Sequence, residues 1–320
     1  MLLEKRVPFL YLFGQIKYDL LFVLVMAVCT YSLKRVFGDQ VPKIPVSLPA
    51  FLGTAISLLL SFKLSQSYDR WWEARKIWGS IVNDSRTLVL QILGFTRSSQ
   101  KPHSPSNQAT SGAGPLESQL RIISYRQIGW AYSLSRSLRR QDPLAFDRPG
   151  NPSGNFISEK DRASVSQQQN KPFALLYLQS QDIASLCQQD YINSYQQVQL
   201  DLTITRLVAS MGKAERIKST VFPVTYRQIL RGFIYIFLLI MSMALLELNS
   251  IWELPLDLII SLPFFMIEKT ARYMQDPFEN KPTDTAMTTI AATIETNIKQ
   301  LWNDGQLPVN QDLQDKYYIL

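Results

Sequence analysis

Apolar residues gather in four blocks that are separated by long polar stretches. The blocks occupy residues 20–33, 50–62, 229–246 and 254–267. The first and third are apolar on every side of a helix, whereas a surface helix of a soluble protein has a single apolar stripe. The first block is shorter than the roughly 20 residues that cross a bilayer, but its flanking residues extend it. The pattern predicts four membrane spans, at about residues 18–36, 48–64, 229–247 and 251–268.

The second apolar block continues into a long amphipathic stretch. No proline lies between Pro49 and Pro102, which predicts a nearly continuous helix of about 45 residues and about 70 Å. Residues 98–114 are rich in Ser, Gly and Pro and predict a flexible surface loop. The polar remainder predicts cytosolic helices at about residues 65–97, 116–141, 157–219 and 284–303. We therefore expect an all-α polytopic membrane protein with a cytosolic helical region, organised as a single domain over residues 1–320.

Charge indicates how the spans are oriented. The connection ELNSIWE between the third and fourth spans contains acidic residues but no Lys or Arg, whereas Arg227, Arg231, Lys269 and Arg272 lie on the other side. Short loops rich in Lys and Arg stay in the cytoplasm, so both termini are predicted to be cytoplasmic. Lys and Arg together number 33, against 26 Asp and Glu. Because the chain has no dense basic run with interleaved aromatic residues, we expect membrane lipids and not nucleic acid as partners.

Few residues suit catalysis or metal binding. Cys29 and Cys187 lie far apart without a CxxC companion, which argues against a zinc site, a redox motif or a disulfide framework. The single histidine, His103, lies in the Ser, Gly and Pro stretch. A nucleophile with a neighbouring base is not evident in the sequence. We expect neither an enzyme nor a cofactor.

Three residues of the long helix recur every four positions and share one face. They are Thr54, Leu58 and Phe62. If several subunits surround an axis with this face inward, the three positions become rings that form a constriction about 12 Å long. Rings of Leu and Phe would control permeation by excluding water. From spacing alone, ordinary packing is the stronger interpretation of Leu58 and Phe62.

The segment YDRWWEARKIWGSIVNDSR at residues 68–86 combines aromatic residues with charges of alternating sign. Trp71 and Trp78 are seven positions apart and lie on one helical face. One interpretation is an aromatic belt at the membrane boundary with solvated charge pairs. The other is a subunit interface, to which we assign the residues Trp71, Trp72, Trp78, Arg70 and Glu73.

Asp257 is a charged residue within the fourth apolar block. A charge in this position is either a functional intramembrane group or close enough to the external surface to be hydrated. Because Asp257 lies only four residues beyond Glu253, we favour hydration.

Three separated motifs resemble the bacterial branch of the bestrophin family. They are SFKLSQSYDRWWEARKIWGSIVNDSR at residues 61–86, FPVTYRQIL at residues 222–230 and QDPFENKPTD at residues 275–284. The resemblance implies a homopentameric funnel around one central pore, in which each subunit contributes four membrane helices and a larger cytosolic helical region. It also implies a hydrophobic neck whose rings fall on Thr54, Leu58 and Phe62. Thr54 departs from the aliphatic residue expected there.

The resemblance further implies a cytosolic aperture and raises the question of calcium. Counting back from the Phe-Pro motif places the aperture at Tyr195, with Ile192 as the alternative. Animal members carry consecutive acidic residues as a calcium clasp. This chain retains only Glu279 and Asp284, with Lys281 between them, and a lysine opposes a cation. We therefore expect no metal site.

The resulting functional expectation is an ion channel of the bacterial inner membrane that passes small monovalent ions, with chloride or other anions favoured. The positive ring edge of Phe62, the net charge of +7 and the absence of carboxylates from the neck favour anions. Asp190 and Asp201 flank the aperture and favour the alternative, a sodium channel of the same architecture. A non-transporting, membrane-associated helical scaffold is a further alternative.

Overall fold

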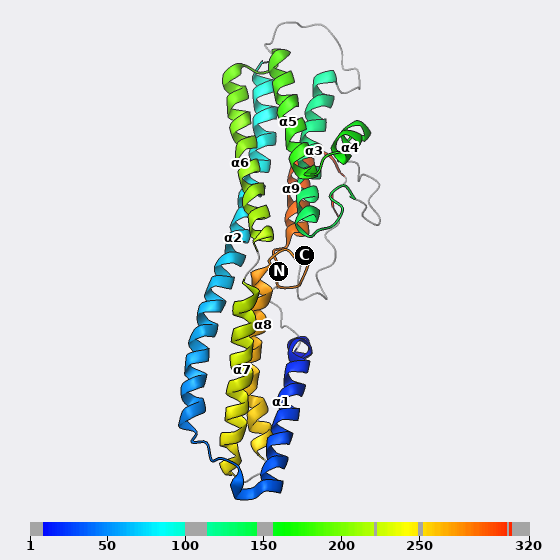
Figure 1. Cartoon of the computed structure of the whole chain (residues 1–320). Helices are drawn as coiled ribbons and strands as arrows, with labels where there is room; N and C mark the ends of the chain where they lie inside the picture. Colours follow the sequence, from blue (N-terminus) through cyan, green and yellow to red (C-terminus); the bar gives the residue numbers. More distant parts are fainter. Residues whose placement is uncertain are drawn as a thin grey trace. The chain divides into compact units, whose positions relative to one another are not determined.

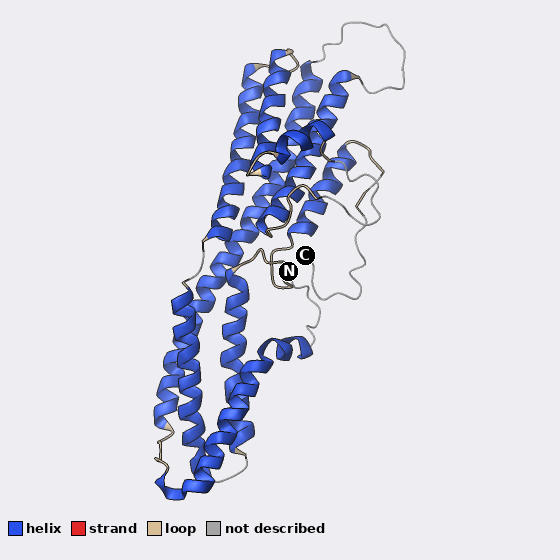
Figure 2. Ribbon diagram, turned by 45° about the vertical axis from the view of Figure 1, so that its right-hand side comes forward, coloured by secondary structure: helices blue, strands red, loops and turns tan. Residues whose placement is uncertain are grey.

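The computed structural model describes residues 9–99, 114–145, 156–220, 223–248, 252–305 and 307–308. These residues form α-helices, two short 3-10 helices and connecting turns, without a strand (Figures 1 and 2). The all-helical class predicted from the sequence is confirmed for this part of the chain. In chain order the elements are α1 (Phe9–Phe37), η1 (Gly38–Gln40), α2 (Ser47–Ser99), α3 (Pro115–Leu138), α4 (Glu159–Ser166), α5 (Lys171–Gln188), α6 (Ser194–Ser219), α7 (Val224–Leu245), η2 (Leu246–Leu248), α8 (Glu253–Gln275) and α9 (Met287–Leu301).

The chain divides into two compact units. The apolar unit comprises residues 2–72 and 220–277, and the polar unit comprises residues 73–219 and 278–320, with Met1. Helix α2 contributes its first part to the apolar unit and its second part to the polar unit. It is uninterrupted because residues 50–99 contain no proline, as the sequence predicted.

The apolar unit consists of α1, the first part of α2, α7 and α8. Helix α1 packs against α7 and α8, and α7 packs against α8. Among the residues that the structure describes, three helices are long and apolar enough to cross a membrane by length and composition: Phe13–Phe37 of α1, Ser47–Thr96 of α2 and Val224–Leu245 of α7. Helix α8 falls outside this group, and it carries Asp257 and Pro263 in its interior.

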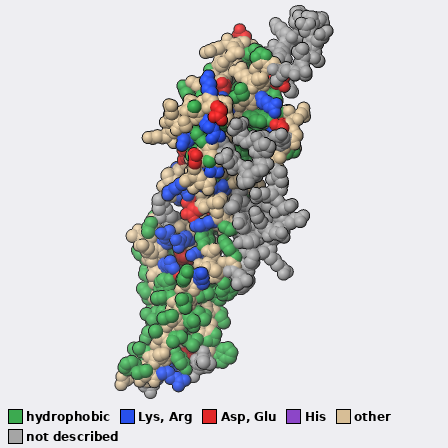
Figure 3. Space-filling model, turned by 90° about the vertical axis from the view of Figure 1, so that its right-hand side faces the viewer, with side chains coloured by type: hydrophobic (Ala, Val, Ile, Leu, Met, Phe, Trp, Pro, Cys, Tyr) green, Lys and Arg blue, Asp and Glu red, His purple; other side chains and the backbone are tan. Residues whose placement is uncertain are grey.

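Large apolar side chains cover the outside of the apolar unit. They include Phe22 and Val25 of α1, Ile236 of α7 and Ile259 of α8, and hydrophobic side chains dominate the face of this unit seen in Figure 3. A soluble monomer rarely exposes so much contiguous apolar surface. This surface requires lipid or another protein surface as its surroundings.

The interior of the apolar unit contains polar contacts between its helices. Lys63 of α2 and Glu268 of α8 form an ion pair of 2.9 Å, and both side chains are almost inaccessible. Arg231 of α7 donates a hydrogen bond to Asp19 of α1. Asp257 has no exposed surface, so the interpretation that placed it in contact with external water does not fit the structure.

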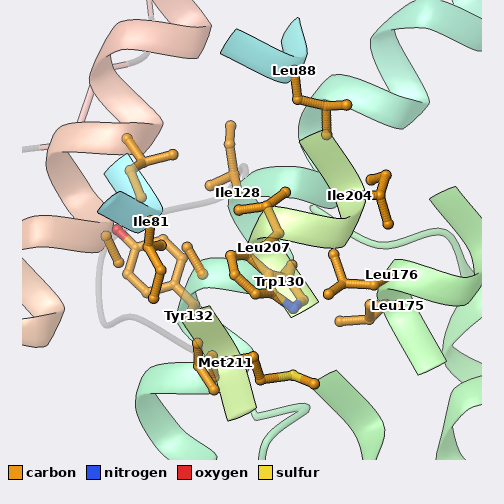
Figure 4. Packing of buried hydrophobic residues seen from close by; sticks show 14 of the residues in the cluster. Ile81, Leu88, Ile128, Trp130, Tyr132, Leu175, Leu176, Ile204, Leu207 and Met211 are labelled. Carbon is orange, nitrogen blue, oxygen red and sulfur yellow. The ribbon is translucent and has the colours of Figure 1, made fainter. Parts of the chain in front are cut away.

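The polar unit is a helical bundle around α3. Helix α3 packs against α5, α6 and α9, and the second part of α2 contributes Ile81 and Leu88 to the same hydrophobic core (Figure 4). A Cβ atom at Gly129 of α3 would lie 2.8 Å from the side chain of Ile157. Only glycine therefore allows the segment before α4 to pack this closely on α3.

The helices of the polar unit start and end at specific local signals. The predicted stretch of residues 157–219 is divided into α4, α5 and α6. Asn170 caps α5 by accepting a hydrogen bond from the backbone N–H of Phe173. Asp190 adopts a positive φ of 59° in the turn after α5, which reverses the chain before α6.

Candidate pore-lining surface

Thr54, Leu58 and Phe62 lie on a free face of α2. Leu58 and Phe62 are each 57% exposed, and Thr54 is also exposed. The opposite side of the same stretch packs into the apolar unit through Ile56 and Leu60. The three predicted positions are therefore available to line a shared passage. The alternative interpretation, that Leu58 and Phe62 are ordinary packing residues, does not hold within one copy of the chain.

Local chemistry keeps this free face uncharged. The Thr54 hydroxyl donates a hydrogen bond of 2.9 Å to the backbone carbonyl of Ala50, so its proton is used within the helix and its oxygen remains an acceptor. Lys63 follows Phe62 directly, but its side chain is buried and its ammonium contacts Glu268. The free face therefore presents a hydroxyl oxygen, an aliphatic side chain and an aromatic ring.

The aromatic segment of α2 divides into an exposed part and a buried part. The rings of Trp71 and Trp72 lie 6.3 Å apart, with Tyr68 stacked 6.5 Å from Trp72. Trp72 is largely exposed and Trp71 partly exposed, as an interfacial belt or a subunit interface requires. Trp78 has no exposed surface and lies in the core of the polar unit. Its side chain stabilises the fold of the unit and presents no surface to a neighbouring subunit.

The two charged residues assigned to the interface form contacts within the chain. Arg70 donates a hydrogen bond to the backbone carbonyl of Thr220, within the apolar unit. Glu73 accepts a hydrogen bond of 3.1 Å from Arg216, within the polar unit. Both partners of the Glu73–Arg216 pair are well exposed, so this pair contributes little to stability.

The structure separates the two aperture candidates. Tyr195 is 86% exposed in the first turn of α6, whereas Ile192 is 2% exposed and belongs to the core of the polar unit. Tyr195 is therefore the better candidate. Asp190 is exposed, and burial raises the pKa of Asp201 above its usual value.

The residual acidic positions of the third motif do not converge. The carboxylate of Glu279 pairs with Lys281, while Asp284 is buried and accepts a hydrogen bond of 3.0 Å from the backbone N–H of Lys281. Among the described residues, no group of three or more His, Cys, Asp or Glu side chains is placed to hold a metal ion. His103 lies outside the described residues.

These contacts predict that calcium does not control the protein. We expect ionic currents in planar bilayers to be unchanged when a calcium chelator replaces calcium, because Glu279 is neutralised by Lys281 and Asp284 is buried. Glu279→Gln serves as the matched variant and should behave in the same way. A current that rises with calcium and loses this response in Glu279→Gln would contradict the prediction.

Sequence reasoning missed the buried ion pair between Lys63 and Glu268. Both residues lie near the ends of apolar blocks, where snorkelling to water explains a charge equally well. The same holds for Asp19 and Arg231, whose pairing depends on α1 and α7 being neighbours. The sequence does show opposite charges in or beside different apolar blocks, which indicates that ion pairs between helices are possible. It does not show which of these residues pair.

Comparison with known proteins identifies the family. Residues 11–300 match the family model of the bacterial/fungal bestrophin proteins. The chain is 28% identical over 269 residues to the voltage-dependent anion channel-forming protein alr2987 of Nostoc sp., covering 81% of this chain and 80% of that protein. It is 24% identical over 271 residues to YneE of Escherichia coli K12, also named a voltage-dependent anion channel-forming protein, covering 85% and 81% of the two chains.

Solved structures agree with this assignment at the level of the fold. A bacterial bestrophin homolog from Klebsiella pneumoniae aligns with a TM-score of 0.76 at 24% identity, over 92% of this chain and 100% of that chain. The family model covers most of the chain, and the structure has helices long and apolar enough to cross a membrane. This protein is therefore a membrane protein of the bacterial and fungal bestrophin family.

Proposed function

We propose that this protein is a homopentameric anion channel of the bacterial inner membrane, built from subunits that each form a single domain over residues 1–320. Each subunit contributes four spans, at about residues 18–36, 48–64, 229–247 and 251–268, and both termini are cytoplasmic. The observation that carries the proposal is the uncharged free face of α2 with Thr54, Leu58 and Phe62. Membership of a family whose relatives are named anion channel-forming proteins supports it.

The exposed apolar surface supports assembly from several copies. In the polar unit, Leu90 of α2 and Val198 and Leu202 of α6 are exposed, although this unit carries the charged and polar composition of a protein in water. Val198 and Leu202 lie four positions apart on one face of α6, and an apolar patch on the surface of such a unit is a candidate protein interface. Trp72 extends the candidate interface into the apolar unit.

The chemistry of the free face supports small anions as the permeating ions. Phe62 can turn its positive ring edge toward an anion, and no carboxylate lies on this face of α2 between Thr54 and Phe62. Asp190 and Asp201 are the residues that favour sodium as the alternative ion.

Reversal potentials test the proposed function. The purified protein is reconstituted in planar bilayers under a gradient of potassium chloride, and the potential at zero current is measured. We expect a value near the equilibrium potential of chloride. A value near the potassium potential would establish the cation alternative, and the absence of any current together with a monomeric mass in detergent would overturn the channel assignment.

Tyr195 is expected to influence which ions pass. Tyr195→Ala should change the permeability ratio between chloride and larger anions by a factor of about two to ten, since removing a ring of aromatic side chains widens an aperture. The ratio is obtained from reversal potentials under bi-ionic conditions. Tyr177→Ala, which removes another exposed tyrosine, on α5, is the matched control and should leave the ratio unchanged. Equal effects of both variants would remove Tyr195 from the proposed aperture.

A further inference from the structure

The apolar unit contains a cavity at the end of α1 and α7 that the channel function does not use. Its volume is about 350 Å³. Its lining includes Lys34 of α1, Gly38 of η1, Lys43 of the segment that follows η1, Met243 of α7, and Leu246 and Glu247 of η2. The lining residues therefore include two lysines, one glutamate and several apolar residues.

Local structure brings these residues to one place. The hydroxyls of Thr30 in α1 and Ser242 in α7 form a hydrogen bond of 2.7 Å. Thr30 lies about one helical turn before Lys34, and Ser242 is the residue directly before Met243. Gly38 adopts a positive φ of 52° just after α1, a conformation that favours glycine. The chain turns there, so that Lys43 lines the same cavity as Lys34.

The three charged groups of the cavity are not neutralised by ion pairs of their own. In the part of the chain that the structure describes, Lys34, Lys43 and Glu247 form no salt bridge. Arg35, the neighbour of Lys34, differs because its guanidinium donates a hydrogen bond of 2.8 Å to the hydroxyl of Tyr31. The cavity is thus suited to a ligand that carries both signs of charge.

A phospholipid headgroup with a primary amine has this chemistry. Its phosphodiester is an anion that lysine side chains bind, and its ammonium group pairs with a carboxylate. A simple anion would be attracted by the lysines but repelled by Glu247. Leu33 and Phe37, the chain neighbours of Lys34 and Gly38, and Leu239, one helical turn before Met243, are exposed. They offer an apolar surface for acyl chains.

We propose that this cavity binds the headgroup of a zwitterionic, primary-amine phospholipid. The phosphate lies between Lys34 and Lys43, and the ammonium group lies at Glu247. A soluble phosphate compound shares part of this chemistry, so the test must distinguish the lipid from the free anion.

Native mass spectrometry of the full-length protein in detergent provides the test. The protein is incubated with equimolar phosphatidylethanolamine and phosphatidylglycerol of matched acyl chains, and the retained lipid is counted. We expect a preference for phosphatidylethanolamine. Glu247→Gln should reduce retained phosphatidylethanolamine about two- to fivefold, which is the change in affinity that the loss of one exposed ion pair causes. Retained phosphatidylglycerol should not fall. The double variant Lys34→Gln/Lys43→Gln should reduce both lipids.

Arg35→Gln is the matched control, because it removes a neighbouring charge that does not line the cavity, and it should retain both lipids as the unchanged protein does. Competition with inorganic phosphate separates the two sources of ligand. If phosphate displaces the lipid as effectively as glycerophosphoethanolamine does, the cavity is an anion site and the proposal is overturned. Equal lipid preference in Glu247→Gln and the unchanged protein would also overturn it. Lipid retention is measured without ion flux, so failure of the channel assignment would leave this test intact.

Discussion

Phe62→Ala is expected to raise the single-channel conductance for chloride about tenfold. In the proposed assembly, Phe62 and Leu58 form rings that hinder wetting, and lowering such a barrier by about 1.4 kcal/mol changes a rate tenfold. Both side chains are exposed on α2 within one copy of the chain, so truncation leaves no cavity in the core of the apolar unit. Single-channel recordings in planar bilayers measure the effect. Leu58→Ala should act in the same direction.

Control variants must distinguish an effect on the neck from a general effect of removing an exposed apolar side chain. Ile259→Ala removes a comparably exposed apolar side chain from α8 and should leave conductance unchanged. Leu60→Ala alters the buried side of α2 and should lower stability by about 2–5 kcal/mol, in contrast to Leu58→Ala. If conductance is the same in Phe62→Ala, Leu58→Ala and Ile259→Ala, the free face of α2 does not line the passage.

Breaking the buried ion pair of the apolar unit is expected to destabilise the protein strongly. Lys63→Met leaves Glu268 as a buried carboxylate without its ammonium partner, and such a loss costs about 3–5 kcal/mol. Chemical denaturation in detergent micelles at fixed protein concentration measures the free energy of unfolding. Fixed concentration is necessary because assembly shifts apparent stability.

The double variant Lys63→Met/Glu268→Met tests whether the cost arises from the unpaired charge. Replacing both partners with apolar side chains should restore the free energy of unfolding to within about 1 kcal/mol of the unchanged protein, or raise it. Glu73→Gln breaks the exposed pair with Arg216 and should change stability by less than about 1 kcal/mol. A double variant that is as unstable as Lys63→Met would show that the loss reflects packing and not charge.

Several features of the site could be predicted because they follow from local sequence. The uninterrupted α2 follows from the absence of proline within it and from the apolar start that passes into an amphipathic stretch. The common face of Thr54, Leu58 and Phe62 follows from helical periodicity. The position of Lys281 between Glu279 and Asp284 is also a local feature, and the structure pairs this lysine with Glu279.

Other features depended on contacts between distant segments and could not be predicted. Trp78 and Trp72 belong to the same aromatic motif, yet Trp78 is buried by the polar unit while Trp72 is exposed. Ile192 and Tyr195 are three residues apart, and only the packing of the polar unit shows that Ile192 is in the core. Asp257 was expected to meet water because it follows Glu253 closely, but α8 directs it into the apolar unit.

The sequence by itself determined the helical class, the apolar segments, the long second helix and the family motifs, since helix formation and hydrophobic periodicity depend on neighbours a few residues apart. The tertiary structure decided which face of each helix is buried, that Lys63 pairs with Glu268, and that Lys34, Lys43 and Glu247 share one cavity. The reason is that burial and pairing require segments separated by about two hundred residues to meet. Which segments meet depends on the packing of whole helices.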